Sequence, residues 1–184
     1  PPEPEPTLIT SGPNAYWVEG EVTVGGGAAT ITVNSQEYQE WHGLGGTFNE
    51  AGWSALQALS AEDRDRAIRL LFDGQDGIGF DWGRIPIGAS DYAVARYTLN
   101  ETAGDVTMAN FSIEHDKNAQ YGLIPYIKAA QAVKPDMRFW ASPWTPPTWM
   151  KSPSRGGASG YDGGVMTNTP EMLGANALYQ VRFV

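Results

Sequence analysis

The chain has 184 residues, 41% of them hydrophobic and 18% charged, which is typical of one sizeable globular domain and argues against intrinsic disorder. Its net charge of −9 argues against binding to nucleic acid, because phosphate neutralisation needs clustered Lys and Arg. The absence of Cys excludes disulfides and thiolate chemistry, and the absence of any run of about 18 apolar residues argues against insertion in a membrane.

The N-terminal part predicts a linker followed by a β segment. Residues 1–9 are rich in Pro and Glu and predict an extended linker. A linker of this kind can remain after a secreted precursor has been processed. We therefore expect a secreted or extracellular protein, with periplasmic and surface-anchored locations left open. Within residues 10–40, the stretches 16–24 and 28–33 alternate apolar and polar residues, which predicts two half-buried strands joined by the glycines at 25–27.

From residue 41 onward, the pattern alternates between strands and helices. The predicted strands cover 41–48, 78–87 and 137–141. The predicted helices cover 50–59, 60–74, 122–134 and a last stretch from 169 onward. This alternation indicates a parallel α/β fold, and the long loops follow the strand ends, where a (β/α)8 barrel places its chemistry. Three units cannot close such a barrel, so we expect the chain to be a fragment of one.

The third predicted strand runs into a stiff segment that is rich in aromatic residues. Three prolines within residues 143–147 cannot donate to a strand ladder, and they force an extended, turning backbone. Trp144 and Trp149 lie in and directly after this segment. Two interpretations remain open for them: the floor of a binding cleft, or two core residues under a loop.

Arg84 lies in an otherwise apolar strand, where an unpaired charge costs several kcal/mol. It therefore requires a carboxylate partner, for which Asp81 and Asp91 are candidates within the chain.

The two histidines do not predict a metal site. His42 and His115 are far apart in the sequence and lack a second nitrogen or carboxylate at metal spacing, so His115 and Asp116 are predicted to be solvated in a polar loop. Ser90, beside Asp91, is not part of a nucleophile elbow, which argues against serine hydrolysis. We expect no metal and no cofactor.

Four segments carry a resemblance to a known family. They are residues 43–51 (Gly-Leu-Gly-Gly-Thr-Phe-Asn-Glu-Ala), 84–92 (Arg-Ile-Pro-Ile-Gly-Ala-Ser-Asp-Tyr), 110–113 with 123–125, and 141–151 (Ala-Ser-Pro-Trp-Thr-Pro-Pro-Thr-Trp-Met-Lys). In this order and spacing, from about residue 36 onward, they resemble glycoside hydrolase family 30. The resemblance implies a (β/α)8 TIM barrel with a β-sandwich-like side domain. Residues 10–40 would supply a β segment of the side domain, and residues 41–184 about the first three βα units of the barrel.

The resemblance also implies roles for individual residues. Asp91 matches the aspartate that hydrogen-bonds sugar hydroxyls in the −1 subsite, and Tyr92 stands beside it. Trp144 matches the tryptophan that lines the same subsite, and Arg84 matches an arginine near the nucleophile. Both catalytic glutamates are expected beyond Val184. Asn49 and Glu50 imitate the acid/base motif in letters only, and we assign them no catalysis.

The implied reaction is retaining hydrolysis of a β-glycosidic bond, with endo cleavage of a β-1,6-linked glucan as the favoured activity. Glucosylceramidase, β-1,6-galactanase and β-xylosidase activities remain open, as does a non-catalytic carbohydrate-binding module that uses Trp144, Tyr92 and Asp91. The expected partner is the rest of the barrel, present as a second chain. Alone, the chain is expected to be inactive and insoluble, because apolar strand residues such as Phe80 and Phe139 would face the missing strands.

Overall fold

The computed structural model describes residues 7–23, 25–28, 30–154, 157 and 160–184. Contacts between residues divide the chain into two units, Pro1–Glu40 and Trp41–Val184, and each is described by itself. Within the described residues, no helix has both the length and the apolar character needed to span a membrane.

The N-terminal unit contains a hairpin whose position differs from the prediction. Strands β1 (Leu8–Gly12) and β2 (Ala15–Gly20) pair antiparallel. Strand β1 begins inside the predicted linker, of which residues 1–6 lie outside the described residues. The described part of 28–33 forms no strand, and Ile31 and Val33 are 85% and 94% exposed. Alternation alone misled here, because a strand needs a partner and the nearer partner for residues 15–20 precedes them.

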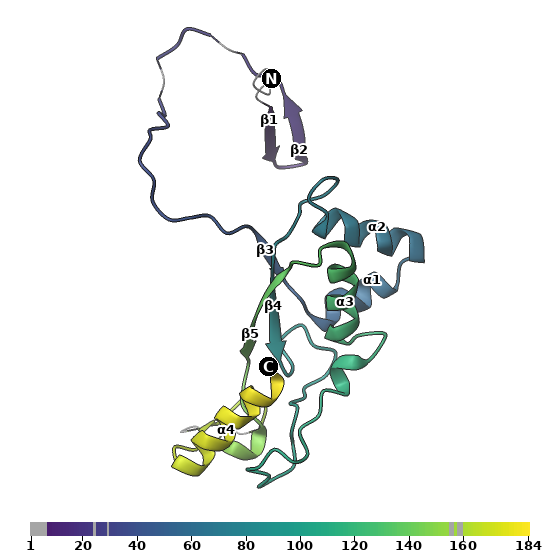
Figure 1. The fold of residues 1–184 in the computed structure, drawn as a ribbon, viewed down its shortest axis with the longest axis vertical. Coiled ribbons are helices and arrows are strands. Elements are labelled where there is room, and N and C mark those ends of the chain that lie inside the picture. The colour runs from purple at the N-terminus through teal and green to yellow at the C-terminus, as the bar shows by residue number, and fades with distance from the viewer. Residues whose placement is uncertain (1–6, 24, 29, 155–156, 158–159) are drawn as a thin grey trace. The chain divides into compact units, whose positions relative to one another are not determined.

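The second unit is built on a parallel three-stranded sheet in the order β3-β4-β5. The strands are β3 (Gly45–Thr47), β4 (Trp82–Ile87) and β5 (Arg138–Pro143). Thr47 lies opposite Arg84 in the register, and Arg84 lies opposite Trp140. The predicted parallel α/β arrangement is therefore confirmed (Figure 1).

Two glycines allow close packing in this sheet. A Cβ atom at Gly45 would lie 2.3 Å from the carbonyl oxygen of Trp82. A Cβ atom at Gly83 would lie 2.5 Å from the ring of Phe48 and 2.8 Å from that of Phe139. Such distances exclude any side chain without a shift of the neighbours, which explains why Gly occurs in strand interiors that it would otherwise weaken.

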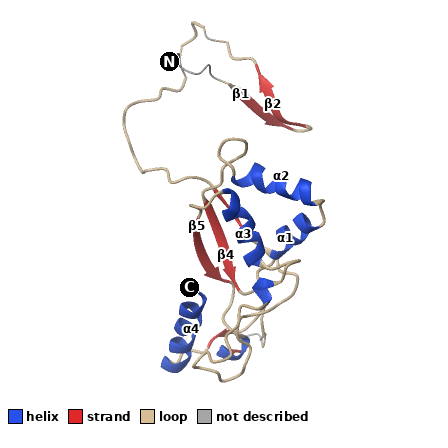
Figure 2. Ribbon diagram, turned by 45° about the vertical axis from the view of Figure 1, so that its right-hand side comes forward, coloured by secondary structure: helices blue, strands red, loops and turns tan. Residues whose placement is uncertain are grey.

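Three helices pack together beside the sheet: α1 (Glu50–Gln57), α2 (Ala61–Phe72) and α3 (Leu123–Val133) (Figure 2). The Asn49 side chain caps α1 by accepting from the Gly52 N–H at 2.7 Å. The Ser60 hydroxyl caps α2 by accepting from the Asp63 N–H at 3.1 Å, as the sequence predicts. The apolar side chains buried between the helices and the sheet form the helix-layer core: Phe48, Trp53, Ile68, Phe72, Tyr126, Ala130 and Met137.

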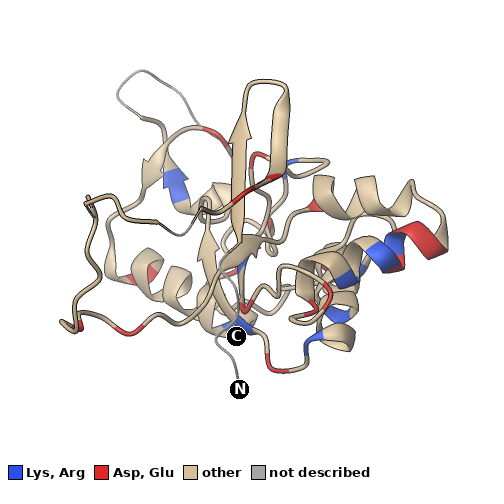
Figure 3. Ribbon diagram, turned by 90° about the horizontal axis from the view of Figure 1, so that it is seen from above, with Lys and Arg blue, Asp and Glu red and all other residues tan. Residues whose placement is uncertain are grey.

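The outer face of α2 is charged. Its exposed residues include Glu62 and Arg66. Figure 3 shows acidic and basic stretches next to each other on this helix. Its Ile68 and Phe72 are buried in the helix-layer core. The helix is thus amphipathic, and one face turns to the sheet while the other turns to water.

The expectation for Phe80 and Phe139 is wrong. Both side chains pack against the helix-layer core, on the helix side of the sheet. Side chains alternate along a strand, so the opposite face carries the neighbouring residues. We call this face, which consists of Trp82, Arg84, Arg138, Trp140 and Ser142, the open sheet face. Trp140 is 54% exposed on it.

A second core lies beyond the strand ends, under helix α4 (Pro170–Phe183). We call it the loop core; its buried members are Ile87, Leu99, Met108, Met150, Ala175 and Tyr179. The N–H of Leu99 donates to the buried Tyr179 hydroxyl at 3.1 Å, which ties the long loop after β4 to α4. Thr169 caps α4 and Pro170 occupies its first position, as predicted.

Four short elements complete the unit. Two are single-turn 3-10 helices, His115–Lys117 and Thr148–Met150. The others are the two-residue strands β6 (Lys151–Ser152) and β7 (Val165–Met166), which pair antiparallel and which the sequence pattern did not indicate.

Candidate functional site

Three of the residues singled out from the sequence lie where two parallel strands end. Asp91 and Tyr92 follow β4, and Trp144 follows β5 directly. All three are exposed, Tyr92 to 59% and Trp144 to 49%. No hydrogen bond or ion pair among the described residues joins their side chains to one another. The carboxyl edge of the sheet thus presents a carboxylate, a phenol and an indole to solvent, where a ligand can contact them.

Arg84 is held by polar and aromatic contacts. Its Nε donates to the Ser142 hydroxyl at 3.0 Å, and its guanidinium lies over the Trp140 ring, 5.7 Å from the centroid. Asp81 pairs instead with Lys134 at 3.0 Å, and within the described residues no carboxylate lies at ion-pair distance from Arg84. The alternative partners Asp81 and Asp91 are therefore not paired with Arg84, and its pairing with the nucleophile expected beyond Val184 stays a prediction. Hydrogen bonding and half-exposure on the open sheet face take the place of an ion pair.

A shallow pocket of about 280 Å³ lies on the open sheet face beside Arg84. Its lining consists of Gly43, Gly45, Gly46, Thr47, Trp82, Arg84 and Trp140. The Trp82 indole N–H donates to the main-chain carbonyl of His42 at 2.9 Å, and His42 is not among the residues that line the pocket. Indole surfaces beside a guanidinium combine apolar contact with fixed hydrogen-bond donors.

The two tryptophans after β5 have different environments. The Trp149 N–H donates to the carbonyl of Asn100 at 2.9 Å, and its ring packs against the loop core. Trp144 remains half exposed. Trp149 is thus partly buried against the loop core, whereas Trp144 is exposed at the edge of the sheet, and contact of either ring with a ligand stays a prediction.

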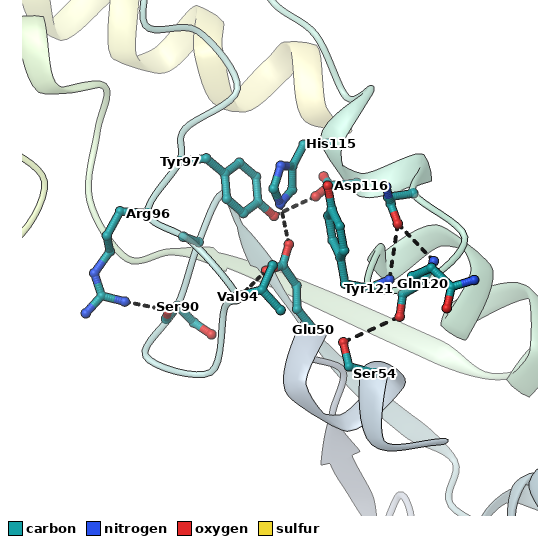
Figure 4. A network of polar contacts seen from close by, with 12 residues as sticks. Glu50, Ser54, Ser90, Val94, Arg96, Tyr97, His115, Asp116, Gln120 and Tyr121 are labelled. Carbon is teal, nitrogen blue, oxygen red and sulfur yellow. Dashed lines mark hydrogen bonds and ion pairs between the residues drawn. The ribbon is translucent and has the colours of Figure 1, made fainter. Parts of the chain in front are cut away.

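A polar network that no sequence motif indicated links the long loop after β4 to the start of α1. Nε2 of His115 lies 2.5 Å from Oε1 of Glu50, and the His115 ring stacks on Tyr97 with centroids 3.6 Å apart (Figure 4). Asp116 is only 2% exposed and accepts from the Tyr97 hydroxyl at 2.6 Å. The prediction that His115 and Asp116 are solvated is therefore wrong, because the long loop folds back onto the start of α1.

Burial changes the acidity of two members of this network. Burial raises the pKa of Asp116 above its usual range, although the Tyr97 hydroxyl and His115 act in the opposite direction. The pKa of Tyr97 is also raised, first by burial and then by the adjacent Asp116 carboxylate. Within the described residues, no group of three or more His, Asp or Glu side chains could hold a metal ion.

Comparison with known proteins assigns the chain to a family. Residues 41–184 match the glycosyl hydrolase family 30 TIM-barrel domain. The chain belongs to glycosyl hydrolase family 30. Its sheet and the helices that cover it are therefore part of a (β/α)8 barrel, as the sequence motifs indicated.

The known proteins to which this chain is similar are much longer than the chain itself. Putative glucosylceramidase 1 of Caenorhabditis elegans is 33% identical over 127 residues, which is 68% of this chain and 24% of that protein. Lysosomal acid glucosylceramidase of Mus musculus is 31% identical over 161 residues, 80% of this chain and 30% of that protein. The solved endo-beta1,6-glucanase BT3312 superposes with a TM-score of 0.71 at 26% identity, covering 93% of this chain and 36% of that one. The chain thus spans about a quarter to a third of these proteins.

Proposed function

We propose that this family 30 chain forms the N-terminal part of a retaining β-glycosidase, with endo-β-1,6-glucanase as the favoured activity. In this proposal both catalytic glutamates come from the part of the barrel outside residues 1–184. Asp91, Tyr92 and Trp144 bind the substrate, and Arg84 supports the nucleophile.

The observation that carries the proposal is the arrangement at the carboxyl edge of the sheet. TIM-barrel enzymes place their chemistry at this edge, and here it presents the exposed Asp91 and Trp144. Retaining glycosidases need two carboxyl groups about 5–5.5 Å apart, one protonated and one ionised. Arg84 has no ion-pair partner among the described residues, so its guanidinium is available to keep a neighbouring nucleophile ionised.

Two similarities bear on the substrate. The likeness to the endo-beta1,6-glucanase BT3312 extends over 93% of the chain and favours a β-1,6-glucan. The likeness to the mouse lysosomal acid glucosylceramidase covers 80% of the chain and makes a glucosylceramide the second candidate. An exposed indole suits either, because it stacks on the apolar face of a glucose ring.

The first experiment uses the full-length protein that contains this chain. Hydrolysis is measured on β-1,6-glucan, glucosylceramide, β-1,6-galactan and a β-xyloside, and the anomeric form of the first product is followed by NMR. We expect β-1,6-glucan to be cleaved at internal bonds with retention of the β configuration. Inverted product would contradict the mechanism, and preference for another substrate would replace the glucanase assignment.

The second experiment separates an enzyme fragment from a binding module. Residues 1–184 alone should be poorly soluble and inactive. Within the described residues, the outer edges of β3 and β5 pair with no further strand, and Trp82 and Trp140 line an exposed face. Coexpression with the remainder of the barrel should restore solubility and hydrolysis. A soluble, monomeric 1–184 that binds glucan would instead support a non-catalytic carbohydrate-binding module.

A further inference from the structure

The loop that carries Asp91 and Tyr92 is attached to the first turn of α1. The Ala51 N–H donates to the Tyr92 carbonyl oxygen at 2.9 Å. The Val94 N–H donates to Oε2 of Glu50 at 2.6 Å (Figure 4). Both bonds lie within three residues of Asp91, so they fix the path of the backbone that presents its side chain.

Glu50 is itself firmly held. It is the first residue of α1 and is 2% exposed. Its Oε1 faces Nε2 of His115 at 2.5 Å, while its Oε2 accepts from Val94, so both carboxylate oxygens are used. The His115 ring is fixed in turn by stacking on Tyr97. A negative charge in the first turn of a helix is also stabilised by the helix dipole.

The burial of Glu50 decides how it can act. A carboxylate that is 2% exposed, with both oxygens bound by protein groups, does not reach a sugar in a solvent-filled cleft. Its two bonds instead join α1 to two different stretches of the long loop, one at Val94 and one at His115. Its effect on a substrate must therefore pass through the loop.

We propose that Glu50 is a positioning residue of the substrate site. It holds the loop of Asp91 and Tyr92 against α1, so that Asp91 meets the sugar in one orientation. This inference rests on the proposed function, which places Asp91 in contact with the sugar. It differs from a catalytic role for the Asn49-Glu50 pair, which the burial of Glu50 argues against.

Two substitutions in the full-length enzyme separate the attachment from simple packing. Glu50→Ala removes both bonds, and we expect kcat/KM per folded molecule to fall between about ten- and a hundredfold, since a misplacement of about 1 Å can cost about 10²-fold. Glu50→Gln keeps the shape and an oxygen that can accept from Val94, and it should recover most of the activity. The control Ile68→Ala opens the helix-layer core, and it should lower Tm while kcat/KM stays unchanged.

A double-mutant cycle tests whether Glu50 acts through Asp91. In the Asp91→Asn background, Glu50→Ala should cost about threefold or less, because the residue that it positions is already impaired. Equal costs in both backgrounds would overturn the inference, as would a Glu50→Ala enzyme with wild-type kcat/KM.

Hydrogen exchange supplies a readout that does not depend on turnover. The Val94 amide should exchange at least about tenfold faster in Glu50→Ala than in wild type or Ile68→Ala, since its acceptor is lost. Unchanged exchange at Val94 would overturn the inference even if activity falls. Failure of the proposed function looks different: the wild-type enzyme would hydrolyse no β-glycoside, and the role of Glu50 would fall with it.

Discussion

The guanidinium of Arg84 lies over the indole ring of Trp140, its direct partner across the parallel register of β4 and β5. Two residues closer to the amino ends of the strands, a second such pair has its arginine on β5 and its tryptophan on β4. There the Arg138 guanidinium lies over the Trp82 ring, 5.4 Å from the centroid. The open sheet face thus carries two cross-strand Arg–Trp contacts. The Arg84 side chain also donates to Ser142, which lies near the carboxyl end of β5.

Arg84→Lys should lower kcat/KM of the full-length enzyme about tenfold, a cost of about 1.4 kcal/mol. Lysine keeps the charge but loses the planar group that lies over Trp140 and donates to Ser142. Steady-state kinetics and a thermal melt measure the effect. Arg138→Lys is the matched control, since it removes the same kind of stacking farther from the carboxyl edge, and it should leave kcat/KM near wild type.

Trp144→Ala should weaken substrate engagement without unfolding the protein. Stacking on a sugar covers roughly 60–80 Å² of apolar surface, worth about 1.5–2 kcal/mol or a ten- to thirtyfold loss in kcat/KM. Trp149→Ala provides the contrast. Its ring packs against the loop core, so its removal should lower Tm. A large fall in Tm for Trp144→Ala, with full activity per folded molecule, would make Trp144 a core residue.

Asp91→Asn should reduce kcat more than it raises KM. The aspartate would accept charge-assisted hydrogen bonds from sugar hydroxyls, and bonds of this kind strengthen in the oxocarbenium-like transition state. Asparagine keeps the shape, so binding should persist. Asp136→Asn is the control, since its side chain is 83% exposed near the start of β5. A wild-type kcat in Asp91→Asn would exclude Asp91 from the site.

Asp116→Asn should raise Tm, and the gain should be larger at pH 7 than at pH 4. Burial raises the pKa of Asp116 in the folded state, so its contribution to stability is complete below the unfolded pKa of about 3.9 and is lost as pH rises through the folded pKa. Asparagine avoids the buried charge and can still accept from the Tyr97 hydroxyl. His115 and Glu50, which also face Asp116, are present in both proteins.

Asp105→Asn should show the opposite dependence on pH. Hydrogen bonds to Asp105, first from the Asn110 N–H, hold its pKa well below the usual range. Its contribution to stability is therefore present above the unfolded pKa and is lost as pH falls through the folded pKa. The Tm difference between wild type and Asp105→Asn should thus shrink on acidification. Melts of Asp116→Asn from about pH 4 to pH 7, and of Asp105→Asn below about pH 4, each run beside the wild type, check the two signs.

Elements with strong local signals were predictable from the sequence. Ser60 and Thr169 cap their helices as expected, and the alternation of strands with helices gave the parallel sheet. The motif residues Asp91 and Trp144 lie at the carboxyl edge because a strand-loop pattern fixes their place along the chain. Their contact with a sugar stays a prediction.

Contacts between distant segments were not predictable. Glu50 and His115 are 65 residues apart, and nothing in either local pattern indicates that the loop between β4 and α3 folds back onto α1. The side of the sheet to which Phe139 points depends on the register and on the packing of α3, so the apolar run of β5 left it open. Leu8 and Ile9 were missed as strand residues because a short run among prolines carries little signal.

The two cores are completed by different lengths of chain. All the buried members of the helix-layer core come from residues 48–137, whereas the loop core also needs Ala175 and Tyr179 of α4. During synthesis on the ribosome, the first core can therefore assemble before α4 has emerged, consistent with domains that fold from their N-terminal end. The loop of Asp91 can then dock early on α1, whereas the segment around Trp149 can complete its packing only after α4 has been synthesised.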